Sequence, residues 1–578
     1  MSDITSQPAR LPGLRLGLTS PVLLLGLATV LLFTLLALPL TVPIGAFYWD
    51  TFIYFDAANR LADGQMPSVD FFAPAGPLGY WLFALLNDIF SQAQPALLAQ
   101  YMMLVVTAPL FAAVLMDVDR HSRTTAFCLL LPFLIFVALP FNATPFSSYP
   151  GIDGFGYYNR QCIHLLYVLT AALIFATNRS VLLTVLVGTM TALFLTKITG
   201  FVSGGLLCAF AILAGRVSIR EGFVVFAGFA VILIALEAAT GVTSAYVADL
   251  TTLAIMNDGV LLQRFLQAGS LHFGICASAG LLCLLLLYAQ RHDLLKQLKA
   301  LPADMALSRA AVLFDRGAIW LGVALFAGLF FETQNTGSQP FVFIWPVILA
   351  ILLNTNELKG TLRIACLILA AAATLPLLVS TVHRAVRAAV GQAQYVTMDL
   401  PHMKTLDQVS QRPEIVERSA TVLDLYKRFP QTFEAFAENR ILPSFTYYTE
   451  EDAQLAWLRA VDEGVEAIEA YETENDVRFD TIFSLNFTNP FPYLMDRHAP
   501  KGVPIGADPY RTVPEPSETV LAELEATDLV LYPRCPVTNA IEDLYHFYEP
   551  ALASRKTIAL SSCWDGLVKP ENLSAPAQ

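Results

Sequence analysis

The feature of this chain that most restricts its fold is a series of apolar runs, each comparable in length to a bilayer span. A transmembrane helix needs about 17–25 predominantly apolar residues. Eleven runs approach this length, near residues 21–43, 96–116, 124–141, 160–177, 181–196, 201–215, 222–240, 273–290, 317–331, 340–353 and 364–382. The composition agrees, because 55% of the 578 residues are hydrophobic and 14% are charged, whereas soluble proteins carry about 25% charged residues. We therefore predict a polytopic α-helical membrane protein with about eleven transmembrane helices.

The positions of Lys and Arg predict the orientation of these helices, because cytoplasmic loops carry an excess of both residues. If the N-terminal residues 1–20 are cytoplasmic, fourteen of the eighteen basic residues before residue 384 lie inside, and four lie outside: Arg60, Arg160, Lys197 and Arg264. No small-residue cleavage site follows the first run, so we expect a retained helix rather than a signal peptide. An odd number of helices then places the C-terminal segment on the outer face.

The charge divides the chain into two parts. Residues 384–578 hold 17 Lys and Arg against 30 Asp and Glu, whereas residues 1–383 hold 18 of each. We predict a transmembrane domain over 21–383 and an acidic extracytoplasmic domain over 384–578, and this balance argues against nucleic acid as a partner of either. The C-terminal domain is predicted to be an α/β unit, from an amphipathic helix at 449–475 and short apolar runs at 480–485, 528–533 and 557–561.

Acidic and aromatic residues gather in the first outer loop, residues 44–95, directly after the first apolar run. Carboxylates at the mouth of a membrane span are costly to desolvate and tend to mark a functional site. The pattern is carried by Asp50, Tyr54, Ala57-Ala58, Gly64, Asp70-Phe71 and Pro77-Leu78. It resembles the first outer loop of the GT-C superfamily of polyprenyl-phosphate-dependent glycosyltransferases. Thr51 stands where many members have Glu, and the resemblance does not cover the C-terminal domain.

The resemblance implies a membrane glycosyltransferase with a GT-C-like transmembrane domain. Such an enzyme moves a sugar from a polyprenyl-phosphate carrier to a glycan, lipid or protein acceptor, with inversion, on the outer face of a bacterial inner membrane. The C-terminal domain would then be periplasmic. Two functions of other classes stay open: a polysaccharide polymerase or flippase component, and a non-catalytic envelope assembly protein.

Two carboxylates are the catalytic candidates. Asp50 matches the position of the family's base, which accepts the acceptor's proton, and its alternative role is the N-cap of a helix at 51–62. Asp153 is the only acid in the second outer loop, residues 147–158, where many GT-C enzymes carry a carboxylate that orients the acceptor or a metal. Its alternative is an ordinary Asp-Gly turn. The resemblance implies no obligatory cofactor and allows Mg²⁺ or Mn²⁺, while scattered His residues and the lack of a CxxC pair argue against a protein-built zinc site.

Two of the outside cations are candidates for binding the donor's phosphate. Lys197 lies in a very short turn, where a lone ammonium is costly unless an anion meets it, and Arg160 has the shape for bidentate phosphate contact. For each, the alternative is a side chain that snorkels to water. Further candidates for substrate contact come from the first two outer loops and from a polar turn at 331–340: Tyr54, Asp56, Asp70, Tyr158, Asn159, Glu332, Gln334 and Asn335.

Asp56 needs separate mention because it lies six residues beyond Asp50, roughly 240° around a helix. The two carboxylates therefore cannot share one face, and a solvated or helix-end carboxylate is the alternative for Asp56. In the C-terminal domain, Cys535 and Cys563 are its only cysteines and predict a disulfide on the oxidising side of the membrane. The segment 486–492 either contacts substrate or only fixes a turn.

Overall fold

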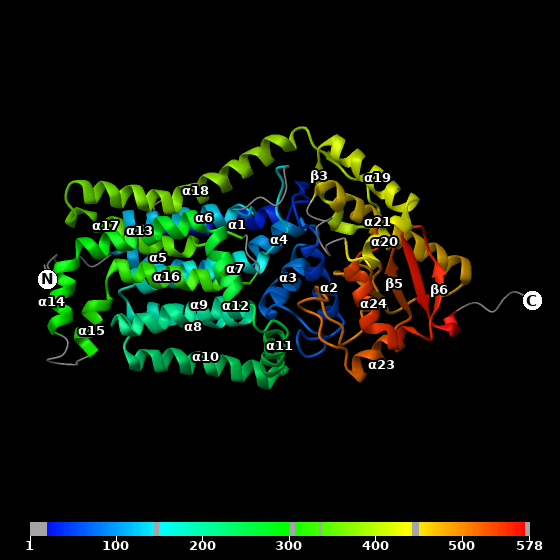
Figure 1. The fold of residues 1–578 in the computed structure, drawn as a ribbon, viewed down its shortest axis with the longest axis horizontal. Helices are drawn as coiled ribbons and strands as arrows, with labels where there is room; N and C mark the ends of the chain where they lie inside the picture. Colours follow the sequence, from blue (N-terminus) through cyan, green and yellow to red (C-terminus); the bar gives the residue numbers. More distant parts are fainter. Residues whose placement is uncertain (1–19, 144–148, 301–306, 335–337, 442–449, 573–578) are drawn as a thin grey trace, which may run out of the picture.

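The computed structural model describes residues 20–143, 149–300, 307–334, 338–441 and 450–572. All eleven apolar runs are helical, which confirms that part of the prediction. The corresponding helices are α1 (Pro21–Leu36), α4 (Pro95–Tyr101) with α5 (Leu104–Asp119), α6 (Arg123–Ala138), α7 (Tyr157–Phe175), α8 (Arg179–Thr196), α9 (Ile198–Leu213), α10 (Ile219–Thr240), α13 (Phe273–Ala289), α16 (Gly317–Phe331), α17 (Trp345–Leu353) and α18 (Thr361–Gln392). They lie roughly side by side along the long axis of the molecule (Figure 1).

Fewer than eleven of the described helices have the length and composition of a transmembrane span. Within the described residues, four helices are long and apolar enough to cross a membrane, or up to six if each of two bent helix pairs is one span. Several other apolar helices are shorter than a bilayer requires, with α17 only nine residues long. The helices give the chain its membrane character, and the count of eleven spans is not confirmed.

Local sequence explains where several helices begin. Proline occupies the first turn of α1 and α4, where its missing N–H has no intrahelical partner in any case. Asn178 caps α8 by accepting the N–H groups of Ser180 and Val181. Ser218 and Glu221 form a capping box at the start of α10. None of the 22 residues of α10 is buried, as expected of an apolar helix at the lipid-facing side of a bundle.

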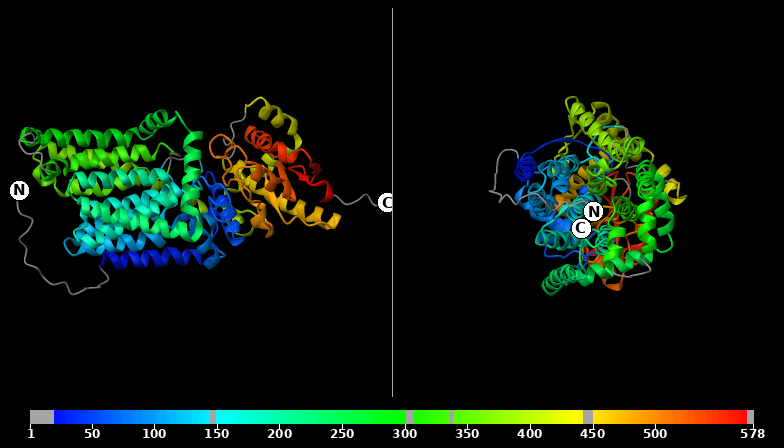
Figure 2. Two further views of the ribbon diagram at one scale, coloured as in Figure 1. Left: turned by 90° about the horizontal axis from the view of Figure 1, so that it is seen from below. Right: turned by 90° about the vertical axis from the view of Figure 1, so that its left-hand side faces the viewer.

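Further helices lie between the bundle and the C-terminal domain or at the bundle's other end. They are α2 (Asp50–Ala62), α3 (Pro77–Ile89), α11 (Val242–Met256), α12 (Leu261–Leu271), α14 (Arg291–Ala300) and α15 (Leu307–Phe314), with short 3-10 turns η2 (Val342–Ile344) and η3 (Thr355–Glu357). Residues 241–272 lie between two of the eleven apolar runs, and the structure forms α11 and α12 there, bent by 86° to each other. Figures 1 and 2 show α2 and α3 between the helical bundle and the C-terminal domain.

The C-terminal domain is α/β, as predicted. Its helices are α19 (Pro413–Arg428), α20 (Pro430–Glu438), α21 (Glu451–Asn475), α22 (Phe491–Met495), α23 (Glu518–Ala526) and α24 (Asn539–Leu552). Its strands β4 (Ile482–Ser484), β5 (Leu529–Pro533), β6 (Lys556–Ala559) and β7 (Trp564–Val568) form one sheet in the order β4-β5-β7-β6. β4 and β5 are parallel, and the other two pairs are antiparallel. The predicted disulfide joins Cys535 to Cys563, which confirms that pairing.

A second, smaller sheet connects the two parts of the chain. β1 (Val42–Pro43), from the first outer loop, pairs in parallel with β3 (Val409–Gln411), and β3 pairs antiparallel with β2 (Val396–Thr397). The long helix α18 also crosses the expected domain boundary after residue 383 and continues to Gln392. The first outer loop is thus built into the C-terminal domain by backbone hydrogen bonds.

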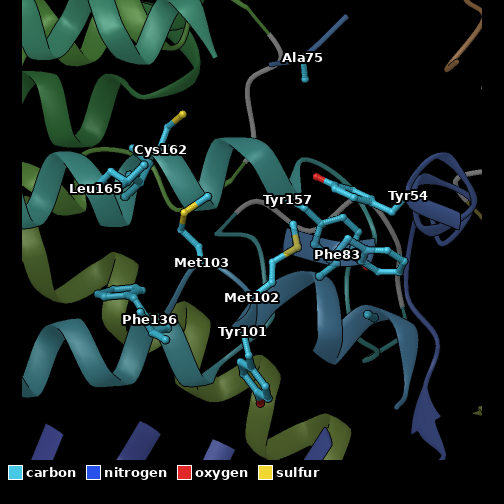
Figure 3. Packing of buried hydrophobic residues seen from close by; sticks show 14 of the residues in the cluster. Tyr54, Ala75, Phe83, Tyr101, Met102, Met103, Phe136, Tyr157, Cys162 and Leu165 are labelled. Carbon is cyan, nitrogen blue, oxygen red and sulfur yellow. The ribbon is translucent and has the colours of Figure 1, made fainter. Parts of the chain in front are cut away.

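The buried core continues from the bundle into the first outer loop. Tyr54 of α2 packs against Phe83 of α3 and Tyr157 of α7, with ring centroids 5.3 and 5.8 Å apart. Figure 3 shows these rings beside Met102. Because α2 is anchored by this aromatic packing, the residue at its start is held in a fixed place relative to α7.

Candidate functional site

A cavity of about 450 Å³ lies where the bundle, the first outer loop and the C-terminal domain meet. The first two outer loops and their helices contribute Asp50, Ile53, Tyr54, Pro74, Ala75, Tyr80, Phe155, Tyr157 and Tyr158. The later helices contribute Lys197, Ile198, Thr199, Tyr246, Leu250, Leu253, Ala254, Asn257, Asp258, Gly259, Leu261, Phe330, Thr333 and Gln334. The C-terminal domain contributes Phe487, Gly506, Asp508, Arg511 and Thr512. The cavity thus combines apolar residues from the membrane helices with polar residues from the outer segments.

Asp50 lines this cavity as the first residue of α2. Its side chain does not cap α2; instead Oδ2 accepts the backbone N–H of Gly156 at 3.3 Å, and the Trp49 side chain also donates to the carboxylate. Burial raises the pKa of Asp50 to about 7, although these two donors and the nearby charge of Arg160 oppose the rise. A carboxyl group with this pKa can exchange a proton near neutral pH, as a general base requires.

Gly156 makes the contact with Asp50 possible. It precedes α7 with a φ of +71°, in the left-handed region that favours glycine. Two residues earlier, a Cβ on Gly154 would lie 2.2 Å from the carbonyl oxygen of Phe47. The second outer loop therefore packs backbone against backbone on the residues before Asp50.

Lys197 lines the cavity between α8 and α9, and 8% of its surface is exposed. Its Nζ donates to Asn159 Oδ1 at 2.6 Å and to the Gln334 carbonyl at 2.8 Å. It also lies 5.1 Å from the ring centre of Tyr158 and 5.2 Å from that of Phe331. An ammonium has three N–H donors, and among the described residues Lys197 forms no ion pair. The site therefore holds a buried cation whose polar and aromatic partners are all uncharged.

The cavity brings together five of the predicted site residues: Asp50, Tyr54, Tyr158, Lys197 and Gln334. Asn159 stands directly behind them as an acceptor for Lys197. Asn335 lies outside the described residues.

Arg160 and Asp153 belong to a buried network beside the cavity and are not among its lining residues. Arg160 Nη1 donates to Asn142 Oδ1 at 2.8 Å, and Nη2 donates to the Asp153 carbonyl at 3.2 Å. The Asp153 carboxylate accepts the Asn142 N–H at 2.8 Å and pairs with Arg384 of α18 at 2.7 Å. The structure thus uses Asp153 to tie the second outer loop to α18.

The remaining predicted carboxylates also have protein partners. Asp56 is buried, not solvated as its alternative supposed, and pairs with Arg60 at 2.8 Å. Asp70 accepts the Met66 N–H and pairs with Lys501 of the C-terminal domain at 3.1 Å. These two carboxylates are not among the residues that line the cavity.

Glu332 is buried next to the turn that holds Lys197. Its Oε2 lies 3.4 Å from Nε2 of His272, which is also buried. Neither carboxylate oxygen has a hydrogen-bond partner in the described structure. Like the two carboxylates above, Glu332 does not line the cavity.

Sequence reasoning missed two contributions to the cavity. The turn Asn257-Asp258-Gly259 and the apolar face of α11 line it, and the Asn-Asp-Gly signal for a turn between two helices was present in the sequence. The loop 506–512 of the C-terminal domain has no motif that would have marked it. Phe487, by contrast, lies in the segment 486–492 that the sequence had singled out.

The described residues include no group of three or more His, Cys, Asp or Glu side chains that could hold a metal ion. The donor set around Asp50 consists of N–H groups rather than further carboxylates. This environment does not fit Mg²⁺ or Mn²⁺, which bind through several oxygen ligands.

Comparison with known proteins gives structural likenesses only. No family model and no curated protein sequence matches the chain. A crystal structure of ArnT from Cupriavidus metallidurans in the apo state is similar at 13% identity and a TM-score of 0.40, over 96% of this chain and 99% of that one. ArnT bound to undecaprenyl phosphate gives 13% identity and a TM-score of 0.39, over 97% and 100%.

The archaeal oligosaccharyltransferase AglB from Archaeoglobus fulgidus, in complex with an inhibitory peptide and a dolichol-phosphate, is also similar. Its identity is 12% and its TM-score 0.32, over 96% of this chain and 75% of that one. TM-scores of this size establish neither a shared fold nor a shared activity, and the assignment of function rests on the residues of this chain.

Proposed function

We propose that this chain is a membrane glycosyltransferase that transfers a sugar from a polyprenyl-phosphate carrier to a hydroxyl-bearing acceptor. The observation that carries the proposal is the composition of one cavity. A buried carboxyl group with a pKa of about 7 and a buried lysine that forms no ion pair with any described residue line the same space. A base for the acceptor and a cation for the leaving phosphate are the two charged groups that this transfer needs.

The reaction follows from these two groups. Asp50 accepts the proton of the acceptor hydroxyl, and the acceptor oxygen attacks the anomeric carbon of the donor sugar. The bond between that carbon and the phosphate oxygen breaks, and polyprenyl phosphate leaves with the electron pair. Lys197 neutralises the phosphate with the N–H that Asn159 and Gln334 do not use. A single displacement of this kind inverts the anomeric configuration.

The apolar lining suits the isoprenoid part of the donor. Five aliphatic side chains and one phenyl ring face the cavity from α9, α11, α12 and α16: Ile198, Leu250, Leu253, Ala254, Leu261 and Phe330. Since these helices belong to the apolar bundle or adjoin it, we expect the prenyl chain to reach the cavity from the lipid side. Burial of its methylene groups adds about 0.8 kcal/mol each.

The C-terminal domain supports binding of the acceptor. Asp508, Arg511 and Thr512 offer hydrogen-bond donors and acceptors to the cavity, and Phe487 offers an aromatic face. A carbohydrate hydroxyl, or another polar acceptor on a lipid or protein, is the chemistry that such a wall can hold. In this assignment Asp153 and Arg160 position the second outer loop, and the charge of Arg160 also favours the ionised form of Asp50.

The site is proposed to face the periplasm of the bacterial inner membrane. The distribution of Lys and Arg supports this orientation, since fourteen of the eighteen basic residues before residue 384 fall on the opposite side. A C-terminal alkaline phosphatase fusion should then be active and a green fluorescent protein fusion dark. The reverse pattern would place the cavity on the cytoplasmic side and contradict this orientation.

The function is tested by lipid and glycan analysis of a deletion strain complemented with the wild type or with Asp50→Asn. The wild type should restore one glycosylated product, and Asp50→Asn should leave that product absent while the lipid-linked sugar accumulates. Asp63→Asn is the matched control, because Asp63 ends the same helix and pairs with His498 outside the cavity. Normal product with Asp50→Asn would favour a polymerase or flippase component or a non-catalytic assembly protein instead.

A further inference from the structure

The residues before Asp50 are held by a side chain more than 400 positions away in the sequence. Gln454, in the first turn of α21, accepts the Tyr48 N–H with Oε1 at 2.6 Å and donates from Nε2 to the Gly45 carbonyl at 2.9 Å. Both ends of one amide are therefore bonded to the backbone that leads into α2. Gln454 is buried, with 2% of its surface exposed.

The segment that Gln454 bonds contains a residue with a strained backbone. Phe47, between the two bonded residues, has a φ of +58°, in the left-handed region that a side chain makes unfavourable. Such a conformation persists where the surrounding structure over-determines it. Here the backbone carbonyl of Phe47 also accepts the Asp50 N–H at 3.2 Å, so the strained residue directly sets where α2 begins.

The C-terminal domain also accepts a hydrogen bond from Tyr48 Oη at the Leu406 carbonyl, at 3.3 Å, and the second outer loop holds the segment from its other side. Gly45 donates to the Ile152 carbonyl, and Gly154 donates to the Ala46 carbonyl, each at 2.9 Å. The segment is thus held between the second outer loop, which also supplies the N–H for Asp50, and the C-terminal domain, which supplies Gln454. If the hydrogen bonds from Gln454 were lost, the hydrogen bonds from the second outer loop alone would not fix the position of Asp50 in the cavity.

We propose that Gln454 is a positioning residue for Asp50, and that the C-terminal domain acts in catalysis by fixing the start of α2. The catalytic part of this inference rests on the proposed function. The clamp, by which we mean the two hydrogen bonds of Gln454 to Tyr48 and Gly45, does not depend on it. The domain then has a role in the reaction apart from lining the cavity. It aligns the carboxylate with the acceptor hydroxyl.

The clamp is tested by hydrogen exchange in the full-length protein in nanodiscs, which needs no substrate. In Gln454→Met, which keeps the length but removes both hydrogen bonds, deuterium uptake should rise in peptides covering residues 45–52. Gln454→Glu keeps an acceptor for the Tyr48 N–H but loses the donor to Gly45, so its uptake should be intermediate. Gln431→Met, at an exposed position of α20, is the matched control and should leave this segment unchanged.

The catalytic consequence is tested with the lipid-linked sugar that accumulates in the Asp50→Asn strain as donor. Gln454→Met should lower kcat by roughly 100-fold, as for a misplacement of about 1 Å, with the KM for the donor unchanged because Lys197 is untouched. Gln454→Glu should recover part of kcat. A general loss of folded protein would instead lower the fraction of active enzyme, without the partial recovery of kcat in Gln454→Glu.

Two results would overturn the proposal. Unchanged uptake over residues 45–52 in Gln454→Met would show that the clamp does not hold the segment. Raised uptake with a kcat equal to that of the wild type would show that the segment does not position Asp50. A wild type that transfers no sugar would refute the proposed function and with it the catalytic role, while the exchange result would still decide the clamp.

Discussion

Replacing Asp50 by Asn is expected to abolish transfer and also to stabilise the folded protein at high pH. Burial raises the pKa of this carboxyl group from 3.8 to about 7. Between these pH values the unfolded chain has released a proton that the folded state keeps, so stability falls as pH rises. At about 1.36 kcal/mol for each pKa unit, the full cost above pH 7 is at most about 4 kcal/mol. Asn still accepts the Gly156 N–H and has no charge to desolvate.

The assay is thermal unfolding of the purified proteins in nanodiscs as a function of pH. Near pH 4, where Asp50 is protonated in the folded state, the wild type and Asp50→Asn should unfold at the same temperature. Near pH 9 the variant should unfold at a higher temperature, although it is inactive. Asp63→Asn should show no such gain. Equal unfolding temperatures at both pH values, or a less stable Asp50→Asn near pH 9, would refute a desolvated carboxylate at this position.

Three further outcomes are expected. Lys197→Ala should weaken binding of undecaprenyl phosphate by roughly 10- to 100-fold, the range for a hydrogen bond to a charged group. Native mass spectrometry measures this binding, and Lys197→Arg should lose less of it. Unchanged binding in the Ala variant would show that Lys197 does not bind the phosphate. Asp153→Asn should destabilise the protein by about 3–5 kcal/mol, since it leaves Arg384 buried without its partner, and unaltered thermal stability would contradict that role. Replacing Cys535 and Cys563 by Ser should lower the stability of the C-terminal domain by about 2–5 kcal/mol, and alkylation of both thiols in the unreduced wild type would disprove the disulfide.

The two carboxylate substitutions separate catalysis from structure. Asp50→Asn should lower activity and raise stability, whereas Asp153→Asn should lower both together. Asp50 has N–H donors and a distant cation as its environment, but Asp153 has a guanidinium in direct contact. The sign of the change in stability therefore distinguishes the carboxylate that acts in catalysis from the carboxylate that stabilises the fold.

The sequence predicted the parts of the site that are marked by charge next to apolar runs. Asp50 and Lys197 could be found because a titratable side chain at the mouth of a span is costly and therefore conspicuous. The helical state of the apolar runs and the α/β character of the C-terminal domain followed from periodicity and run length. The number of spans did not follow from run length, because several of these apolar helices are shorter than a bilayer requires.

The partners of these residues could not be predicted, because they are distant in the sequence. Asp153 pairs with Arg384 across 231 positions, and Gln454 bonds Tyr48 across 406. Neither pair has a local motif. In the same way the helix pair over 242–271 contributes to the cavity through its fold, since its polar residues Asn257 and Asp258 gave only a turn signal. Long-range pairing of this kind is visible only in the folded chain.

The most direct test of the central claim is sugar transfer in vitro. The donor is the purified polyprenyl-phosphate-linked sugar, and the acceptor is isolated from the same strain. The wild type should form product with inverted anomeric configuration, and its rate should rise with pH through about pH 7 as Asp50 ionises. Asp50→Asn should form none, and Asp63→Asn should match the wild type. Retained configuration, or transfer by Asp50→Asn at the wild-type rate, would contradict a single displacement with Asp50 as the base.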